Sequence, residues 1–155
     1  MKLLVVSDSH GRRELLDRII SKEPDCKEII FLGDGLKDIE VMKEFYPDRK
    51  FTCVRGNNDW DYTVSSEAYK HINGVTLVAC HGDTFGVRST LRSLFNKAAS
   101  VKAQLALYGH THVAYETKDP LTEVVAINPG AVCEGRYCVI AFDSGTFTAE
   151  SKSCY

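Results

Sequence analysis

Hydrophobic residues in the first third of the chain form short continuous runs that alternate with helical patterns. Residues 3–6 contain no polar position, which is typical of a strand buried on both faces of a sheet. Residues 28–32 and 51–54 form two similar runs. Between the runs, apolar residues recur at helical spacing over 12–22 and 39–46. We therefore expect a strand, helix, strand, helix, strand order, joined by right-handed crossovers into a parallel sheet.

The pattern changes in the second part of the chain. Residues 67–72 and 75–80 flank Asn73-Gly74, a dipeptide that favours a type I′ turn, so they predict a β-hairpin. A helix is expected over 84–99, because apolar residues lie on one side of it. Further strands are expected at 104–108, 113–117, 123–127, 137–142 and 146–151. The whole pattern predicts an α/β fold in which two packed mixed β-sheets are flanked by helices, a four-layer sandwich.

Side chains that bind metals follow one apolar run after another. Asp8 and His10 follow the first run, and we expect them to share one side because successive side chains of an extended chain alternate. Open α/β sheets bind ligands at the carboxyl ends of their strands. Four of the five histidines lie in such groups, and His71 is expected to be a strand residue without a metal role. The full set is Asp8, His10, Asp34, Asn57, His81, His110 and His112.

This set of side chains suits two divalent cations better than one. A single structural zinc ion needs four ligands and more often uses thiolates. Imidazole, carboxylate and amide groups together favour manganese, iron, nickel, cobalt or zinc. Two such cations stabilise an in-line displacement at phosphorus.

Each group also has a structural interpretation. Asp8 could cap the helix that follows it, and Asp34 could be a turn residue. His81 could be a buried histidine with a satisfied hydrogen bond. His110 and His112, which flank one threonine after a strand, are the hardest to explain in this way.

Taken together, the motifs resemble those of the calcineurin-like metallophosphoesterases. They are Asp8-x-His10, Gly33-Asp34, Gly56-Asn57-x-Asp59, His81-Gly82 and Gly109-His110-Thr111-His112. The chain length and the loop at 128–130 are similar to those of the small YfcE-type phosphodiesterases. The resemblance extends from residue 1 to about residue 142, and we expect residues 1–155 to form a single domain. It implies hydrolysis of a phosphodiester by a hydroxide held between two divalent metal ions.

The resemblance implies a first metal bound by Asp8, His10 and His112. It also implies that the carboxylate of Asp34 bridges the two metals. Manganese is the first expectation for both ions, with nickel, iron, cobalt or zinc as alternatives.

The second metal would be bound by Asn57, His81 and His110. The resemblance gives catalytic roles to these three residues and to Asp59. Asn57 would also contact a phosphate oxygen of the substrate. Asp59 would orient neighbouring histidines or water molecules from behind the metal ligands.

Residue 58 departs from the family pattern. Many members have a histidine directly after the motif asparagine, where it protonates the leaving group, whereas this chain has Asn58. General acid catalysis typically contributes about 10²–10⁴-fold to a rate. We therefore expect faster hydrolysis of diesters with acidic leaving groups than of alkyl monoesters.

Composition narrows the class of partner. The chain has a net charge of −2, with 44% hydrophobic and 26% charged residues, and no basic block that indicates nucleic-acid binding. No apolar run is long enough to span a membrane and no export signal is evident, so we expect a cytoplasmic protein that acts on a small-molecule phosphodiester. The strand edge at 67–71 is a candidate contact between subunits of a homo-oligomer.

The six cysteines include no Cys-x-x-Cys pair, so we expect reduced thiols. A zinc–thiolate or disulfide framework is the less favoured alternative.

A non-enzymatic function is the main alternative. The fold also resembles that of Vps29, a retromer subunit that acts chiefly as a protein-interaction scaffold with a vestigial metal site. All seven ligand positions are filled in this chain, which favours an enzyme.

Overall fold

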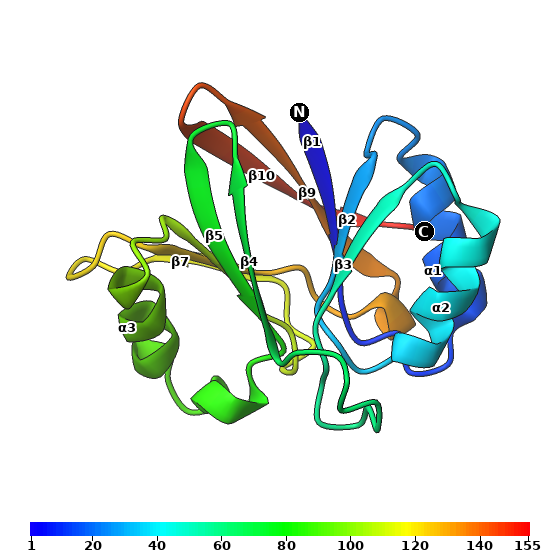
Figure 1. Cartoon of the computed structure of the whole chain (residues 1–155), viewed down its shortest axis with the longest axis horizontal. Helices are drawn as coiled ribbons and strands as arrows, with labels where there is room; N and C mark the ends of the chain where they lie inside the picture. The colour runs from blue at the N-terminus through cyan, green and yellow to red at the C-terminus, as the bar shows by residue number, and fades with distance from the viewer.

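The computed structural model describes residues 1–155 and contains two mixed five-stranded sheets that pack face to face (Figure 1). The first sheet has the order β10-β9-β1-β2-β3. Its strands are β1 (Lys2–Val6), β2 (Glu28–Phe31), β3 (Lys50–Cys53), β9 (Arg136–Asp143) and β10 (Thr146–Ser153). Strands β1, β2 and β3 are parallel, as expected, and the hairpin of β9 and β10 joins antiparallel to β1.

The second sheet has the order β4-β5-β6-β8-β7. Its strands are β4 (Glu67–Ile72), β5 (Val75–Cys80), β6 (Leu105–Leu107), β7 (Tyr115–Lys118) and β8 (Val125–Asn128). Strands β5, β6 and β8 are parallel, and β4 and β7 pair antiparallel at the two edges.

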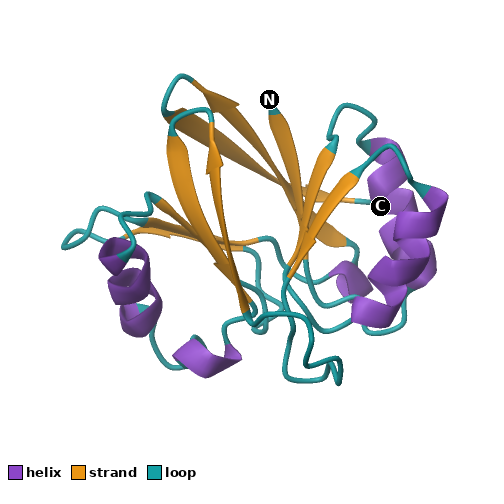
Figure 2. Ribbon diagram, in the orientation of Figure 1, coloured by secondary structure: helices purple, strands orange, loops and turns teal.

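Helices cover the outer face of each sheet (Figure 2). Helices α1 (Arg13–Lys22) and α2 (Leu36–Phe45) lie on the first sheet, and α3 (Arg92–Ser100) lies on the second. The predicted four-layer α/β sandwich is therefore confirmed. No helix is long and apolar enough to cross a membrane.

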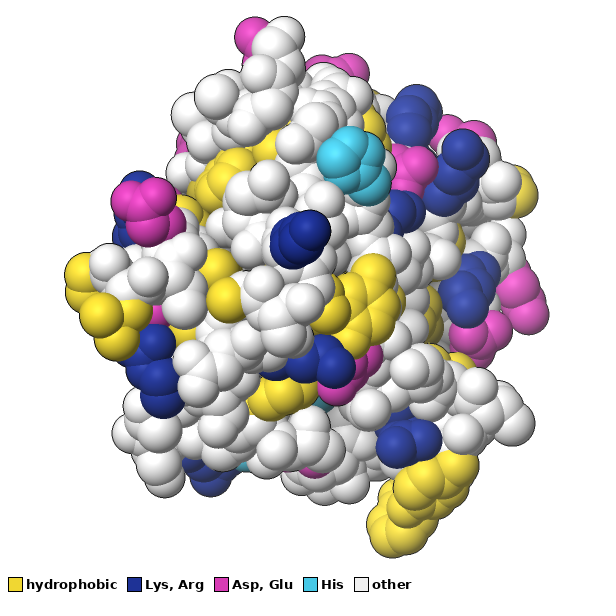
Figure 3. Space-filling view, turned by 60° about the vertical axis from the view of Figure 1, so that its left-hand side comes forward, with side chains coloured by type: hydrophobic (Ala, Val, Ile, Leu, Met, Phe, Trp, Pro, Cys, Tyr) yellow, Lys and Arg dark blue, Asp and Glu magenta, His cyan; other side chains and the backbone are white.

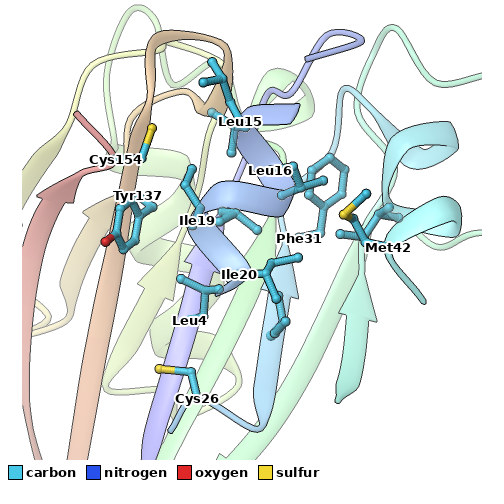
Figure 4. Close-up of a cluster of buried hydrophobic side chains, with 14 of the residues drawn as sticks. Leu4, Leu15, Leu16, Ile19, Ile20, Cys26, Phe31, Met42, Tyr137 and Cys154 are labelled. Atoms are coloured by element: carbon cyan, nitrogen blue, oxygen red, sulfur yellow. The ribbon is translucent and has the colours of Figure 1, made fainter. Parts of the chain in front are cut away.

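Strand β1 is buried on both faces, as its uninterrupted apolar sequence predicts. Leu3 and Val5 belong to the core between the two sheets, whereas Leu4 and Val6 belong to the core beneath α1. Figure 4 shows the buried face of α1, including Leu16, packed against β1 and β2. Because both faces of β1 are covered, the chain that leaves its carboxyl end has a fixed direction.

The helix expected over 84–99 is wrong in its first half. The structure has a short 3₁₀ helix at Asp83–Phe85, and α3 begins only at Arg92. Gly86 adopts a left-handed conformation with φ of 62°, which ends the 3₁₀ helix. Val87 is buried against the second sheet although it lies in a loop, and its apolar side chain therefore fits the helical pattern in the sequence.

The hairpin expected at Asn73-Gly74 is confirmed. Both turn residues have positive φ, as a type I′ turn requires, and Ile72 pairs with Val75 across it. His71 lies in β4, where its Nδ1 is 2.9 Å from Oγ1 of Thr76.

Truncation of a core side chain tests this packing. Leu16 is fully buried, so Leu16→Ala is expected to lower the free energy of unfolding by about 2–5 kcal/mol. Leu121→Ala is the matched control, because Leu121 is 79% exposed and its loss should cost less than about 0.5 kcal/mol. Urea unfolding followed by circular dichroism measures both, and equal midpoints for the two variants would contradict the packing.

Candidate metal centre

The predicted ligand residues lie in loops at one end of the sandwich. The loops after β1 and β2 come from the first sheet, and those after β5 and β6 come from the second. Figure 1 shows these loops together at the lower end of the molecule. The parallel directions of the strands thus bring residues that are far apart in the sequence to a common place.

One group of ligand atoms contains Asp8, His10 and His112. Oδ1 of Asp8 lies 3.1 Å from Nε2 of His112 and 3.6 Å from Nε2 of His10. The two imidazole Nε2 atoms are 3.2 Å apart. These three side chains are the ones expected to hold the first metal.

A second group contains Asp8, Asp34 and His81. Nε2 of His81 lies 3.5 Å from Oδ2 of Asp34 and 3.9 Å from Oδ1 of Asp8. Nδ1 of His110 is 3.2 Å from the same His81 nitrogen. Oδ2 of Asp34 is also 3.7 Å from Nε2 of His10, so this carboxylate lies between the two groups.

The polar atoms of the centre are those that a divalent cation would satisfy. Ser7 and the amide of His110 donate to Oδ2 of Asp8, but its Oδ1 is buried without a hydrogen-bond donor. A buried carboxylate oxygen without a partner is costly and calls for an explanation. Imidazole nitrogens also approach each other at 3.2 Å in two pairs, His10 with His112 and His81 with His110. The donor set therefore fits divalent metal ions.

The backbone reaches this geometry through left-handed conformations. Asp8 and His10 have φ of 56° and 44°, and both lie beyond the end of β1 at Val6. The segment from Asp8 to His10 is therefore not in the extended conformation that the alternation of side chains requires, although the two side chains do converge. Asp34, His110 and His112 also have positive φ. Such conformations cost non-glycine residues free energy and concentrate at functional sites.

Asp59 binds backbone amides and does not contact a histidine. Its carboxylate accepts hydrogen bonds from the N–H groups of Asp34 at 2.7 Å, Gly35 at 2.9 Å, Leu36 at 3.0 Å and Gly56 at 2.9 Å. These contacts differ from the expected orientation of histidines, and the expected orientation of water molecules stays a prediction. Asp59 instead ties the loop after β3 to the loop that carries Asp34.

Asn58, and not Asn57, contacts Asp34. The side-chain amide of Asn58 donates to Oδ2 of Asp34 at 2.7 Å, and its backbone N–H donates to Oδ1 at 2.9 Å. Asn57 is exposed and makes no hydrogen bond to the other predicted ligands; it lines a separate, smaller pocket with Asp83 and Thr84. The structure thus brings together six of the seven predicted ligands and leaves Asn57 beside them.

Two glycines permit the close approach of the loops. A Cβ atom at Gly56 would overlap Oδ1 of Asp34. A Cβ atom at Gly109 would overlap the hydroxyl of Ser7 and lie 2.7 Å from Oδ2 of Asp8. Both positions therefore exclude any side chain on steric grounds.

Backbone contacts fix the histidine side chains. Nδ1 of His81 donates to the carbonyl oxygen of Leu32 at 2.7 Å, which directs Nε2 toward the carboxylates. Asn128 donates to the carbonyl oxygen of Gly109 at 2.9 Å and to the hydroxyl of Thr111 at 3.0 Å. The side chain of Asn128 therefore supports the loop that carries His110 and His112.

The charges of the centre shift its pKa values in opposite directions. Burial raises the pKa of Asp34, but hydrogen bonds from His81 and Asn58 outweigh it and hold that pKa well below its usual range. Burial lowers the pKa of His81, but Asp34 and Asp8 raise it overall. Burial, followed by the charge of His81, lowers the pKa of His110. Asp34 consequently stays ionised at neutral pH, as a metal ligand must.

Removal of the Asp59 carboxylate tests its structural role. Asp59→Ala leaves buried amide groups without an acceptor, and hydrogen bonds to a charged group are worth about 1.5–3 kcal/mol each. We expect the free energy of unfolding to fall by more than about 3 kcal/mol in this variant. Asp25→Ala serves as the control, because the Asp25 side chain is 80% exposed. A loss as small as that of the control would refute the role.

Comparisons with known proteins agree with this centre. The family model of the calcineurin-like phosphoesterase superfamily domain matches residues 1–145. The probable metallophosphoesterase YsnB of Bacillus subtilis is 27% identical over 133 residues, which cover 85% of this chain and 75% of YsnB.

Solved structures share the fold over nearly the whole chain. A predicted phosphoesterase from Streptococcus pneumoniae has a TM-score of 0.82 at 20% identity and covers 99% of this chain and 89% of its own. A novel archaeal phosphodiesterase has a TM-score of 0.73 at 19% identity and covers 98% and 100% of the two chains. Zinc-bound Vps29 from Entamoeba histolytica has a TM-score of 0.75 at 14% identity and covers all of both chains.

At these identities, the structural matches establish the fold alone. The family model carries more weight, because it spans almost all of the sequence and includes every loop of the centre. This chain therefore belongs to the calcineurin-like phosphoesterase superfamily.

Proposed function

We propose that this protein is a metal-dependent phosphodiesterase that hydrolyses a small-molecule phosphodiester with the help of two divalent cations. Its family consists of phosphoesterases, and the preference for a diester and the use of two metals are the finer parts of the proposal. The observation that carries it is the buried Oδ1 of Asp8, which has no hydrogen-bond donor and lies 3.1 Å from Nε2 of His112 and 3.9 Å from Nε2 of His81.

Each metal would have its own set of ligands, and manganese is the ion that we expect first. Asp8, His10 and His112 would hold one cation, and Asn57, His81 and His110 would hold the other, with Asp34 between them. Divalent cations in such a site supply positive charge to phosphate oxygens and make water acidic enough to ionise near neutral pH. Asn57 rests on the family resemblance, because Asn58 provides the amide beside Asp34 in the structure.

The residues around the centre bear on the size of the substrate and on the type of leaving group. A cleft of about 660 Å³ opens beside His10 and Asp34, a size that suits a small ligand. Asn58 lines this cleft but has no proton to give to a leaving group at neutral pH. A leaving group that departs as a stable anion does not need that proton, which supports an activated or acidic diester as the substrate.

Metal dependence tests the proposal as a whole. With Mn²⁺, the protein is expected to hydrolyse bis(p-nitrophenyl) phosphate, and a chelator should abolish the reaction. Asp8→Asn should lower kcat/KM by at least about 100-fold, because even the loss of a residue that supports a metal ligand costs about 10–100-fold. Mn²⁺ should also raise the Tm of the wild type but not of this variant.

Asp25→Asn is the control for the metal experiment, because it removes an exposed carboxylate that precedes β2 and lies 3.9 Å from Lys2 at the start of β1, at the strand ends opposite to the ligand loops. It should keep both the activity and the Mn²⁺-induced rise in Tm. A rise in Tm without turnover of any phosphodiester would favour a scaffold function, and the absence of both would reject the metal site.

The leaving-group preference is a separate prediction. The wild type is expected to have a higher kcat/KM on an aryl diester than on an alkyl phosphate monoester. Asn58→His should raise the rate with poor leaving groups, because an imidazole can donate the missing proton. A plot of the logarithm of kcat/KM against the pKa of the leaving group gives a slope. This slope should be shallower in the variant than in the wild type. An unchanged slope would show that residue 58 does not face the leaving group.

A further inference from the structure

The cleft beside the metal centre carries binding groups that hydrolysis alone does not need. It extends from His10 and Asp34 past the starts of α1 and α2 to the loop after β3. Arg13 and Lys37 line it, and so does the indole of Trp60. Two cationic side chains and one aromatic residue therefore line the same cleft as the proposed reaction site.

The acidic side chains of the cleft are mostly engaged within the protein. The buried carboxylate of Asp38 accepts hydrogen bonds from Ser9 at 2.6 Å, from the amide of Gly11 at 2.8 Å and from Nε of Arg13 at 3.0 Å. The Asp59 carboxylate is similarly engaged by its four amide donors. These hydrogen bonds occupy the carboxylate oxygens without removing their charge, so an anionic ligand is attracted only locally, by Lys37 and the terminal nitrogens of Arg13.

The remaining acid and the free cation lie nearer the rim. Asp61 is exposed and accepts hydrogen bonds from the amide and hydroxyl of Thr63. Lys37 is exposed and makes no ion pair, so its ammonium group is available to a ligand. The terminal nitrogens of Arg13 are likewise free, because only its Nε contacts Asp38.

Trp60 is 80% exposed, but its loop is braced on both sides. The guanidinium of Arg55 lies 4.6 Å from the ring centre of Tyr62 and donates to the carbonyl oxygen of Val64 at 3.2 Å. Asp59, the residue directly before the tryptophan, is anchored by its amide donors. Figure 3 shows hydrophobic side chains that project from the lower edge of the molecule, the edge at which this loop lies in Figure 1.

A braced loop lowers the entropy that must be lost when a ligand covers the ring. An exposed tryptophan is not by itself evidence of a site, since single apolar residues are common on surfaces. Here the ring lines the same cleft as the ligand carboxylate Asp34 and a free lysine. Aromatic rings stack on nucleobases of any sequence, and lysine binds phosphate as a point charge.

We propose that the cleft binds the nucleoside arm of a phosphodiester, with the base stacked on Trp60 and a further phosphate held by Lys37 and Arg13. The substrate class is then a nucleotide-containing diester, and Trp60 is its specificity-determining residue. This inference rests on the proposed phosphodiesterase function of the adjacent centre.

Trp60 is the only tryptophan of the chain, so its fluorescence reports on the cleft directly. Titration of the wild type with ADP, in the presence of a chelator, should quench the emission with saturation. Adenosine should quench it with weaker affinity, and pyrophosphate should not quench it. Lys37→Gln should weaken ADP binding, whereas Lys102→Gln, which removes another exposed lysine without an ion pair, should not. No quenching by ADP would overturn the inference.

Kinetics with two esters of the same leaving group separate this inference from the proposed function. With Mn²⁺, the wild type should prefer the p-nitrophenyl ester of thymidine 5′-monophosphate over methyl p-nitrophenyl phosphate in kcat/KM. Trp60→Ala should lower this preference by about tenfold, mainly through KM, because stacking is lost. Trp60→Phe should retain most of it, and Leu121→Ala, at an equally exposed apolar residue, should retain all of it.

The two hypotheses fail in different ways. If neither ester is hydrolysed in a metal-dependent manner, the proposed function fails, and the fluorescence titration still decides whether the cleft binds nucleotides. If both esters are hydrolysed with equal kcat/KM, or if Trp60→Ala leaves the preference intact, the metal centre stands and the nucleoside site is rejected.

Discussion

The arrangement of the centre depends on the carboxylate of Asp59, which binds backbone amides and does not contact the predicted ligand side chains. Asp59 receives four amide hydrogen bonds and thereby joins the turn after β2 to the turn after β3. Its hydrogen bond from the amide of Asp34 supports the left-handed conformation of that residue, which has φ of 60°. The same anchor sets the position of Trp60, the next residue. The positions of Asp34 and of the cleft wall at Trp60 therefore depend on a single side chain.

The predicted ligand loops share left-handed backbone conformations, which cost free energy. Hydrogen bonds between the loops offset this cost. The amide of Asp8 donates to the carbonyl oxygen of Gly33 at 2.9 Å, and the amide of His10 donates to that of Asp34 at 3.2 Å. These bonds link the loops after β1 and β2 side by side. Strain of about 1–3 kcal/mol per residue persists only where the surroundings determine the conformation in this way.

The sequence predicts the layers well because apolar periodicity reports directly on burial, as the two-sided burial of β1 illustrates. It fails where the conformation of the backbone decides the outcome. Gly86 ends a helical pattern that its neighbours continue, and Asp8 converges with His10 by a left-handed turn that alternation does not describe. Neighbouring residues of one type are a further difficulty: Asn57 and Asn58 have the same side chain, and only coordinates reveal which one contacts Asp34.

The ligand groups come from both halves of the sandwich. Asp8, His10 and Asp34 follow strands of the first sheet, whereas His81, His110 and His112 follow strands of the second. Ions bound among them would join the sheets at one end, in addition to the apolar core between the sheets and the ion pair of Lys70 in β4 with Glu28 in β2. Metal affinity and the free energy of unfolding would then be thermodynamically linked, because ions that bind only the folded protein stabilise the packing of the two sheets.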